Sequence, residues 1–163
     1  WCRKRLEDGI RVLMNQTESD VWQFIKDSWN EFSKLPIEEV SFPRGVQNVM
    51  KYSNPASIYS KGTPIHVRGS LLYNNYLHKH NIDKKYPVIT NGEKVKFCYL
   101  KLPNVINENV ISFVNALPKE FELEPYIDYD TQFSKSFVEP LGVILNKIGW
   151  TTEPVSTLDD FFG

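Results

Sequence analysis

Residues 41–101 read SFPRGVQNVMKYSNPASIYSKGTPIHVRGSLLYNNYLHKHNIDKKYPVITNGEKVKFCYLK, and this stretch carries most of the positive charge. It contains ten lysine and arginine side chains against two acids, Asp83 and Glu93, for a local net charge of +8. The whole chain of 163 residues has a formal net charge of -1. Basic side chains interleaved with tyrosines are typical of a surface that binds a polyanion, but the same pattern also fits a solvated face of a globular domain.

The secondary structure of this stretch is predicted from its turn signals. Residues 37–40 are expected to start a strand, and the proline and glycine in 42–46 indicate a loop. Residues 47–52 fit a helical turn, and residues 70–80 fit a helix. If 65–69 are extended, Ile65 and Val67 face one side and His66 and Arg68 the other. After the Asn91-Gly92 turn, residues 93–100 alternate as a strand does.

The segments before this stretch are predicted to be helical. Apolar residues at positions 6, 10 and 13 predict an amphipathic helix within 1–14. Thr17, with Asp20 three residues later, is a plausible helix N-cap. Large apolar residues at 22, 25, 29 and 32 then form one stripe, which we interpret as a core-facing side of a second helix rather than a ligand box.

The segments after it are irregular and then helical. Residues 103–125 are rich in asparagine and proline, with Phe113 and Leu117 as expected buried anchors. Apolar residues at 133, 137, 141, 144 and 148 predict a helix, which Pro140 must kink or break and Gly149 can end. Eight acids against two lysines between 121 and 163 supply the negative charge that offsets the basic stretch.

Composition and cysteine usage limit the class of protein. A hydrophobic content of 41% supports a packed core, and the length fits one domain, with at most a small appendage. The sequence shows no apolar run that would cross a bilayer and no signal-peptide pattern, so we expect a soluble, intracellular protein. Cys2 and Cys98 are too few for a disulfide framework, which suits a reducing compartment.

The last residues form an unusual group. Leu158, Phe161 and Phe162 would come together on one side of a single helical turn, flanked by Asp159 and Asp160. Such a group of apolar side chains is typical of a peptide that docks on a partner protein. The alternative is that this segment folds back onto its own domain.

Several segments, in this order, resemble the thumb of family B DNA polymerases, most closely that of the replicative polymerases of T-even-type bacteriophages. The resemblance covers nearly the whole chain. Its segments are the Cys-Arg-Lys-Arg-Leu run at 2–6, 35–38, 42–46, 51–52, 64–69, 92–96, 126–133, Pro140-Leu141 and Ile144-Leu145. The stretch 158–162 is similar to a sliding-clamp-binding peptide, with Val155 where such peptides usually carry a glutamine.

The resemblance implies an α+β domain that grips DNA without chemistry of its own. Residues 1–150 would form the thumb-like domain, and 151–163 a linker followed by the clamp-binding peptide. Metal-binding aspartates of this family lie in the palm, so the chain alone would have no catalytic residue, metal or cofactor, while magnesium would serve the complete polymerase. The implied partners are double-stranded primer-template DNA, the palm, fingers and exonuclease parts, and a sliding clamp, with no membrane. The implied location is the cytoplasm of the bacterial host of a phage.

The residues that we expect to contact the duplex combine the charge pattern with this resemblance. They are Arg44, Lys51, Tyr52, Lys61, His66, Arg68, Lys84 and Lys85. Gly45, beside Arg44, has no Cβ and would let backbone approach a phosphate closely. The expected clamp-binding residues are Leu158, Phe161 and Phe162.

Other hypotheses about the function of the chain stay open. A stand-alone nucleic-acid-binding accessory protein would use the same surface, and an independent enzyme is a third hypothesis. Asp128-x-Asp130 has the spacing of a two-carboxylate metal site, but acids also suit the start of a helix. His78-x-His80 with Asp83 offers metal-ligand chemistry without a fourth ligand. Cys98 has no evident base that would make it a nucleophile.

Overall fold

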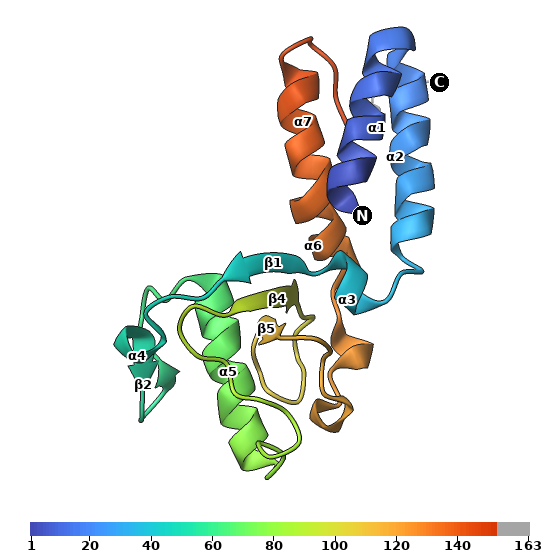
Figure 1. The fold of residues 1–163 in the computed structure, drawn as a ribbon. Coiled ribbons are helices and arrows are strands. Elements are labelled where there is room, and N and C mark those ends of the chain that lie inside the picture. Colours follow the sequence, from blue (N-terminus) through green and yellow to red (C-terminus); the bar gives the residue numbers. More distant parts are fainter. Residues whose placement is uncertain (153–163) are drawn as a thin grey trace. The chain divides into compact units, whose positions relative to one another are not determined.

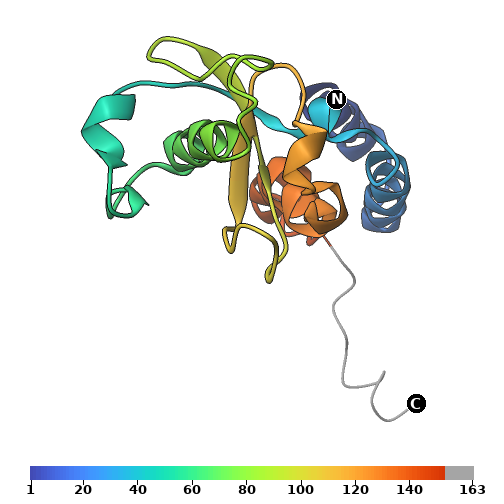
Figure 2. The ribbon, with the colours of Figure 1, turned by 90° about the horizontal axis from the view of Figure 1, so that it is seen from below.

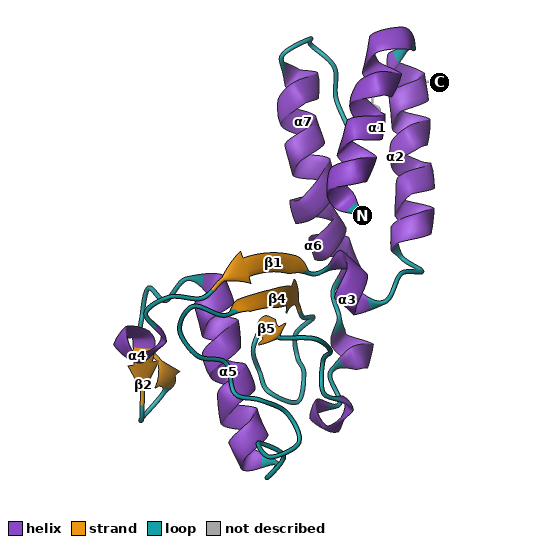
Figure 3. Ribbon diagram, in the orientation of Figure 1, coloured by secondary structure: helices purple, strands orange, loops and turns teal. Residues whose placement is uncertain are grey.

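The computed structural model describes residues 1–152, which form two compact units (Figure 1). The helical unit contains Trp1–Leu35 and the described residues from Phe133 onward, and the sheet unit contains Pro36–Gln132. All strands of the described residues belong to the sheet unit (Figure 3). The predicted α+β class is confirmed. The expected clamp-binding peptide and most of the linker lie outside the described residues, so the division of the chain at residue 150 stays a prediction.

The helical unit brings three helices side by side, as Figures 1 and 2 show. They are α1 (Cys2–Asn15), α2 (Glu18–Phe32) and α7 (Glu139–Asn146). The predicted cap of the second helix is confirmed, because Thr17 and Asp20 form a reciprocal capping box in which the Thr17 backbone N–H donates to Asp20 Oδ2 over 3.0 Å. Hydrogen bonds from Thr17 hold the pKa of Asp20 below its usual value.

Aromatic rings fill the core of the helical unit. Phe32 and Phe137 are fully buried, and the ring centroid of Phe133 lies 5.1 Å from that of Phe32 and 5.0 Å from that of Phe137. The Trp29 ring lies 5.3 Å from the Phe133 ring. The interpretation of the stripe as core is therefore confirmed for Trp29 and Phe32, while Trp22 and Ile25 are half-buried. Tilted or offset rings at these distances add to the stabilisation from buried area.

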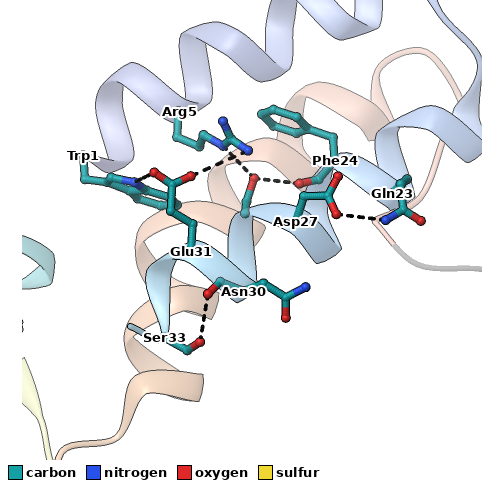
Figure 4. Close-up of polar contacts among 9 residues, drawn as sticks. Trp1, Arg5, Gln23, Phe24, Asp27, Asn30, Glu31 and Ser33 are labelled. Carbon is teal, nitrogen blue, oxygen red and sulfur yellow. Dashed lines mark hydrogen bonds and ion pairs between the residues drawn. The ribbon is translucent and has the colours of Figure 1, made fainter. Parts of the chain in front are cut away.

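A polar cluster fastens α1 to α2 (Figure 4). Arg5 Nε donates to Ser28 Oγ over 2.9 Å, and its guanidinium stands 4.5 Å from the centroid of the Phe24 ring. Arg5 Nη2 lies 3.8 Å from Glu31 Oε2, and Trp1 Nε1 donates to Glu31 Oε1 over 3.0 Å. Because each polar group has its partner within the helix pair, the cluster is explained by packing alone.

The last helical segment is not broken at Pro140, where a kink or a break was predicted, but changes to a π-helical turn directly before α7. The short helix α6 (Tyr129–Phe133) continues into a π-helical turn, η3 (Ser134–Val138), and α7 begins directly after it with Pro140 in its first turn. A proline has no N–H to donate, so the first turn of a helix tolerates it. Gly149 has a φ of 76° and follows the end of α7, which confirms the predicted role of glycine there.

The sheet unit is built on a three-stranded antiparallel sheet in the order β1-β4-β5. Its strands are β1 (Phe42–Gly45), β4 (Lys94–Tyr99) and β5 (Val110–Phe113), with Phe97 opposite both Phe42 and Ser112. Helix α5 (Ile65–Lys79) packs against the sheet at Ser112. A Cβ on Gly69 would lie 2.4 Å from Ser112 Oγ, so glycine permits the close contact between helix and sheet.

On the opposite face of the sheet, the buried side-chain amide of Gln132 links β4 to the segment before β1. Gln132 is fully buried, its Nε2 donates to the Val40 carbonyl over 2.8 Å, and its Oε1 accepts from the Tyr99 N–H over 3.1 Å. The helix α3 (Ile37–Val40) is thereby linked to β4. Cys98, Ile111 and Phe113 are buried on this face of the sheet. Both faces are covered, so the sheet forms the centre of the core of this unit.

Three secondary-structure expectations are wrong, and the condition placed on residues 65–69 is not met. Residues 37–40 form a helical turn, because Ile37 and Val40 are both buried and three residues apart. Residues 42–45 form an edge strand, where a proline is tolerated. Residues 65–69 form the first turns of α5 rather than an extended segment, and the alternation over four residues was too short to distinguish the two. Residues 110–113 form a strand within a segment that was expected to be irregular.

The remaining short elements complete the sheet unit. The predicted helical turn is confirmed as α4 (Val49–Tyr52), which is followed by the hairpin of β2 (Ser53–Asn54) and β3 (Ile58–Tyr59). Two 3₁₀ turns, η1 (Lys119–Phe121) and η2 (Glu124–Tyr126), follow β5, and the expected anchors Phe113 and Leu117 are buried. Among residues 1–152, no helix has the length and apolar character needed to cross a membrane.

Candidate nucleic-acid interface

All eight expected DNA-contacting residues lie in the sheet unit, but only some present a free charge. Arg44 is exposed on β1, Lys51 is exposed on α4, Lys61 is exposed in the turn before α5, and Lys84 is exposed after it. Within the described part of the chain, none of these four has an acidic partner. Exposed cations without ion pairs are the groups that can replace counterions around a phosphate backbone.

Arg44 belongs to a small cluster at the edge of the sheet. Burial lowers the pKa of His66, the positive charge of Arg44 lowers it further, and a hydrogen bond with the Gly45 backbone opposes both effects. His66 is therefore predominantly neutral at pH 7 and contributes as a hydrogen-bonding group rather than as a cation. The cluster joins the edge strand β1 to the first turn of α5.

Gly45 has open space beside it. No heavy atom lies within 4 Å of the position that a Cβ would occupy, beyond the neighbouring residues of the chain, and its φ is not in the left-handed region. Neither packing nor backbone conformation therefore requires glycine here. The open backbone beside Arg44 is compatible with the close approach of a phosphate.

Arg68 is held by the protein itself. Its Nη2 donates to Asn109 Oδ1 over 2.7 Å, its Nη1 lies 4.0 Å from Glu108 Oε2, and its guanidinium lies 5.7 Å from the centroid of the Tyr59 ring. Tyr59 completes the cluster by donating its hydroxyl to Glu108 Oε1 over 2.8 Å. Arg68 Nε is buried without a partner among the described residues. The side chain is 23% exposed, so Arg68 fastens the β2–β3 hairpin to α5 more than it offers charge to a ligand.

Lys85 is neutralised in a similar way. Its Nζ forms an ion pair with Glu120, and the Tyr86 hydroxyl donates to the other oxygen of that carboxylate over 3.0 Å. The hydrogen bond from Lys85 is the largest cause that lowers the pKa of Glu120, to about 2. Glu108 and Glu120 both lie outside residues 41–101, so the local charge of +8 overstates the charge that the folded unit exposes.

Tyr52 lies beside Lys51. Lys51 Nζ stands 5.5 Å from the centroid of the Tyr52 ring, and Tyr52 is partly exposed. The pair therefore combines a cation with an aromatic face, the two groups that nucleic-acid surfaces commonly present together.

Four further cations of the basic stretch are not among the expected contacts, and three of them are exposed. Lys79, Lys94 and Lys101 are exposed and have no acidic partner within residues 1–152. Lys94 lies opposite Gly45 in the register of β1 and β4, next to the Arg44 cluster. The sequence predicts the strand that carries Lys94 but not its pairing with β1, because residues 42–46 have the proline and glycine of a loop.

The residues of the alternative metal sites have ordinary structural roles. Asp128 accepts from the Thr131 N–H over 3.0 Å and from the Thr131 hydroxyl over 2.7 Å, as a residue at the start of a helix does. His78 Nδ1 lies 3.5 Å from Asp83 Oδ2, and the His80 ring packs 5.9 Å from that of Phe121. Among the described residues, no group of three or more potential ligands could hold a metal ion.

Cys98 is fully buried, and burial raises the pKa of its thiol to about 12. Such a thiol stays protonated at neutral pH and has no access to a substrate. The expected clamp-binding residues Leu158, Phe161 and Phe162 lie outside the described residues.

Comparisons with known proteins relate the chain to one part of a polymerase. No protein-family model matches the chain. The DNA-directed DNA polymerase of Enterobacteria phage T4 is 27% identical to it over 165 residues, which include 99% of this chain. The chain is thus similar to a segment of a DNA polymerase along nearly all of its length. It spans only 18% of the length of that relative.

Proposed function

We propose that this chain is the thumb part of a phage replicative DNA polymerase of family B and that it holds primer-template duplex by the sugar-phosphate backbone. The observation that carries the proposal is the similarity to a DNA-directed DNA polymerase along 99% of the chain. The exposed cations of the sheet unit support it, because lysine and arginine side chains neutralise phosphate oxygens. A replicative enzyme works on every sequence, and contacts to phosphates carry no sequence information.

The proposed contact surface consists of the four exposed cations and their neighbours. Arg44, Lys51, Lys61 and Lys84 neutralise phosphates, while Tyr52 and the neutral His66 add contacts to the sugar-phosphate backbone. Arg68 and Lys85 stabilise the fold of the sheet unit through their ion pairs with Glu108 and Glu120. The open backbone at Gly45 admits a phosphate beside Arg44.

Charge reversal on this surface tests the proposal. Arg44→Glu should weaken binding to a blunt 20-base-pair duplex about tenfold or more, since it replaces an attraction by a repulsion. Arg3→Glu makes the same change at an exposed position of the helical unit and should leave the affinity within about twofold. Fluorescence anisotropy measures both variants. Equal affinities of wild type and Arg44→Glu would remove Arg44 from the interface.

The chain is proposed to have no polymerase or exonuclease reaction of its own. The metal-binding aspartates of the polymerase reside in the palm in this proposal, and the contribution of this chain is to hold and orient the duplex. Pure protein should therefore extend no labelled primer with magnesium or manganese present. Primer extension that Asp130→Ala abolishes would overturn the domain assignment.

The proposed tether to a sliding clamp rests on the sequence of residues 158–162. Burial of Leu158, Phe161 and Phe162 on a clamp would contribute on the order of 1.5–3 kcal/mol each before ordering costs. A tether of this kind increases the effective concentration of the polymerase at the primer terminus. Changing Phe161 and Phe162 together to alanine should abolish clamp binding and spare both folding and duplex binding, as calorimetry and anisotropy would measure. If the double variant unfolds the domain, these residues belong to its core.

A further inference from the structure

A cavity of about 640 Å³ in the sheet unit has a chemical character different from that of the charged surface. It lies between α4 with the β2–β3 hairpin, the helix α5 and the loop at residues 88–91. Its volume is in the range of sites for small molecules. All residues that line it belong to the sheet unit.

The lining is apolar with neutral polar groups. The apolar walls include Val49, Met50, Ile58, Leu71 and Ile89. Four asparagines also line the cavity, and His78 is the one ionisable side chain among the described lining residues. Without a lysine, arginine or carboxylate in its wall, the cavity suits an uncharged group and not a phosphate or an ammonium ion.

Two of the asparagines give the cavity a fixed shape. Asn74 Nδ2 donates to the Ile89 carbonyl over 2.8 Å, and Asn74 Oδ1 accepts from the Ile89 N–H over 2.7 Å. Asn91 Oδ1 accepts from the Val49 N–H over 2.8 Å, which holds the start of α4. Because these amides bond backbone from two other segments, the walls are preorganised before any ligand enters.

Other amide groups remain available to a ligand. The side-chain amide of Asn75 has no hydrogen-bond partner within residues 1–152, so it offers both a donor and an acceptor. Asn91 and Asn54 each use their carbonyl oxygen, for the Val49 and Ala56 N–H groups, and keep their NH₂ groups as donors. A planar ligand with a polar edge and apolar faces would match these groups together with the apolar walls.

We propose that this cavity binds a nucleobase from an unpaired nucleotide. An asparagine amide pairs with the donor and acceptor edge of a base, and apolar side chains pack on its faces. Met50 is 80% exposed while it lines the cavity, so its thioether is placed to cover a ring that enters. Lys51 follows Met50 on α4 and is exposed, where it would meet the phosphate that accompanies the base. The DNA strand as the source of the base rests on the proposed function.

The first experiment uses deoxynucleosides, which carry a base without a phosphate. Each of the four is titrated into ¹⁵N-labelled full chain, and the side-chain NH₂ resonances of the asparagines are followed. Deoxynucleosides should shift the signals of Asn75 and Asn91 with affinities on the order of millimolar, while deoxyribose 5-phosphate should not. The absence of shifts with all four deoxynucleosides, or equal shifts with deoxyribose 5-phosphate, would overturn the proposal.

Two variants locate the binding. Asn75→Leu removes the free amide and should weaken deoxynucleoside binding about tenfold. Ser53→Phe fills the cavity from a strand position that favours aromatic residues, and it should abolish binding. Asn30→Leu is the same substitution at an exposed position of α2, which does not line the cavity, and serves as the control. Unchanged binding by a folded Ser53→Phe variant, as judged by thermal unfolding, would place the base elsewhere and contradict the inference.

A third experiment separates the two possible sources of the base. A duplex with a three-nucleotide overhang that carries 2-aminopurine is compared with the blunt duplex. Tighter binding of the overhang in wild type and not in Ser53→Phe indicates the unpaired end of DNA, whereas deoxynucleoside binding without an overhang effect indicates a free nucleotide. If deoxynucleosides bind and the blunt duplex does not, the proposed function fails and the cavity proposal stands. If the blunt duplex binds and deoxynucleosides do not, only the cavity proposal fails.

Discussion

The two arginines of the basic stretch have different surroundings, although the sequence gives them equal charge. Arg44 is exposed on an edge strand beside a glycine with open space. Arg68 is enclosed by Glu108, Asn109 and the ring of Tyr59. Charge and spacing predicted both as DNA contacts, because the acids that neutralise a cation come from residues distant in the sequence.

Arg68 should matter more for stability than for binding. Arg68→Met should lower the free energy of unfolding by about 1–3 kcal/mol, since it leaves a carboxylate and a side-chain amide without their charged donor. It should leave the affinity for duplex nearly unchanged at temperatures where the protein stays folded. Urea unfolding and anisotropy measure the two quantities.

Lys51→Met is the matched control for this change. Lys51 is exposed and has no acidic partner among residues 1–152, so its loss should change stability by less than about 0.5 kcal/mol and weaken duplex binding. A stable Arg68→Met variant that loses duplex affinity would show that Arg68 contacts phosphate after all.

The contact between α5 and the sheet depends on one glycine. Gly69→Ala should destabilise the protein by about 1–3 kcal/mol, because the new Cβ would lie 2.4 Å from Ser112 Oγ and 2.9 Å from the Ser112 backbone nitrogen. Gly45→Ala is the control, since the open space there accommodates a methyl group. Thermal unfolding compares the two, and equal melting temperatures would mean that α5 shifts at no cost.

Long periodic helices were predictable from the sequence because their spacing repeats. The helices α1 and α2 and the capping box at Thr17 follow from local rules that the structure obeys. The edge strand β1 was not predictable in this way, because a proline and a glycine usually indicate a loop and only its pairing with β4 makes it a strand. The start of α5 was missed because a few alternating residues fit either structure.

The candidate site, too, could be predicted from the sequence only where it does not depend on contacts between distant segments. The sequence identified the basic stretch, and Arg44, Lys51, Lys61 and Lys84 are indeed exposed. The pairing of Lys85 with Glu120 joins segments 35 residues apart, so no local rule predicts it. The cavity beside α5 is formed by three separate segments, and nothing in the sequence beyond its asparagines indicates it.

The chain taken as a whole is proposed to bind duplex mainly through charge, although its net charge is only -1. The basic side chains are densest in residues 41–101, while acids outnumber them in residues 121–163. Such an arrangement keeps the protein near neutral overall and leaves a basic central segment that attracts phosphates. The strength of binding should then depend on salt and not on base sequence.

The salt dependence of duplex affinity tests this claim most directly. If the four cations Arg44, Lys51, Lys61 and Lys84 each replace a counterion, a plot of log affinity against log salt should have a slope of about -3.6. Arg44→Ala should reduce the slope by about 0.9, Arg68→Ala should leave it unchanged in the folded protein, and duplexes of unrelated sequence should give the same line. A slope near zero, or affinities that differ strongly between sequences, would contradict binding through the phosphate backbone.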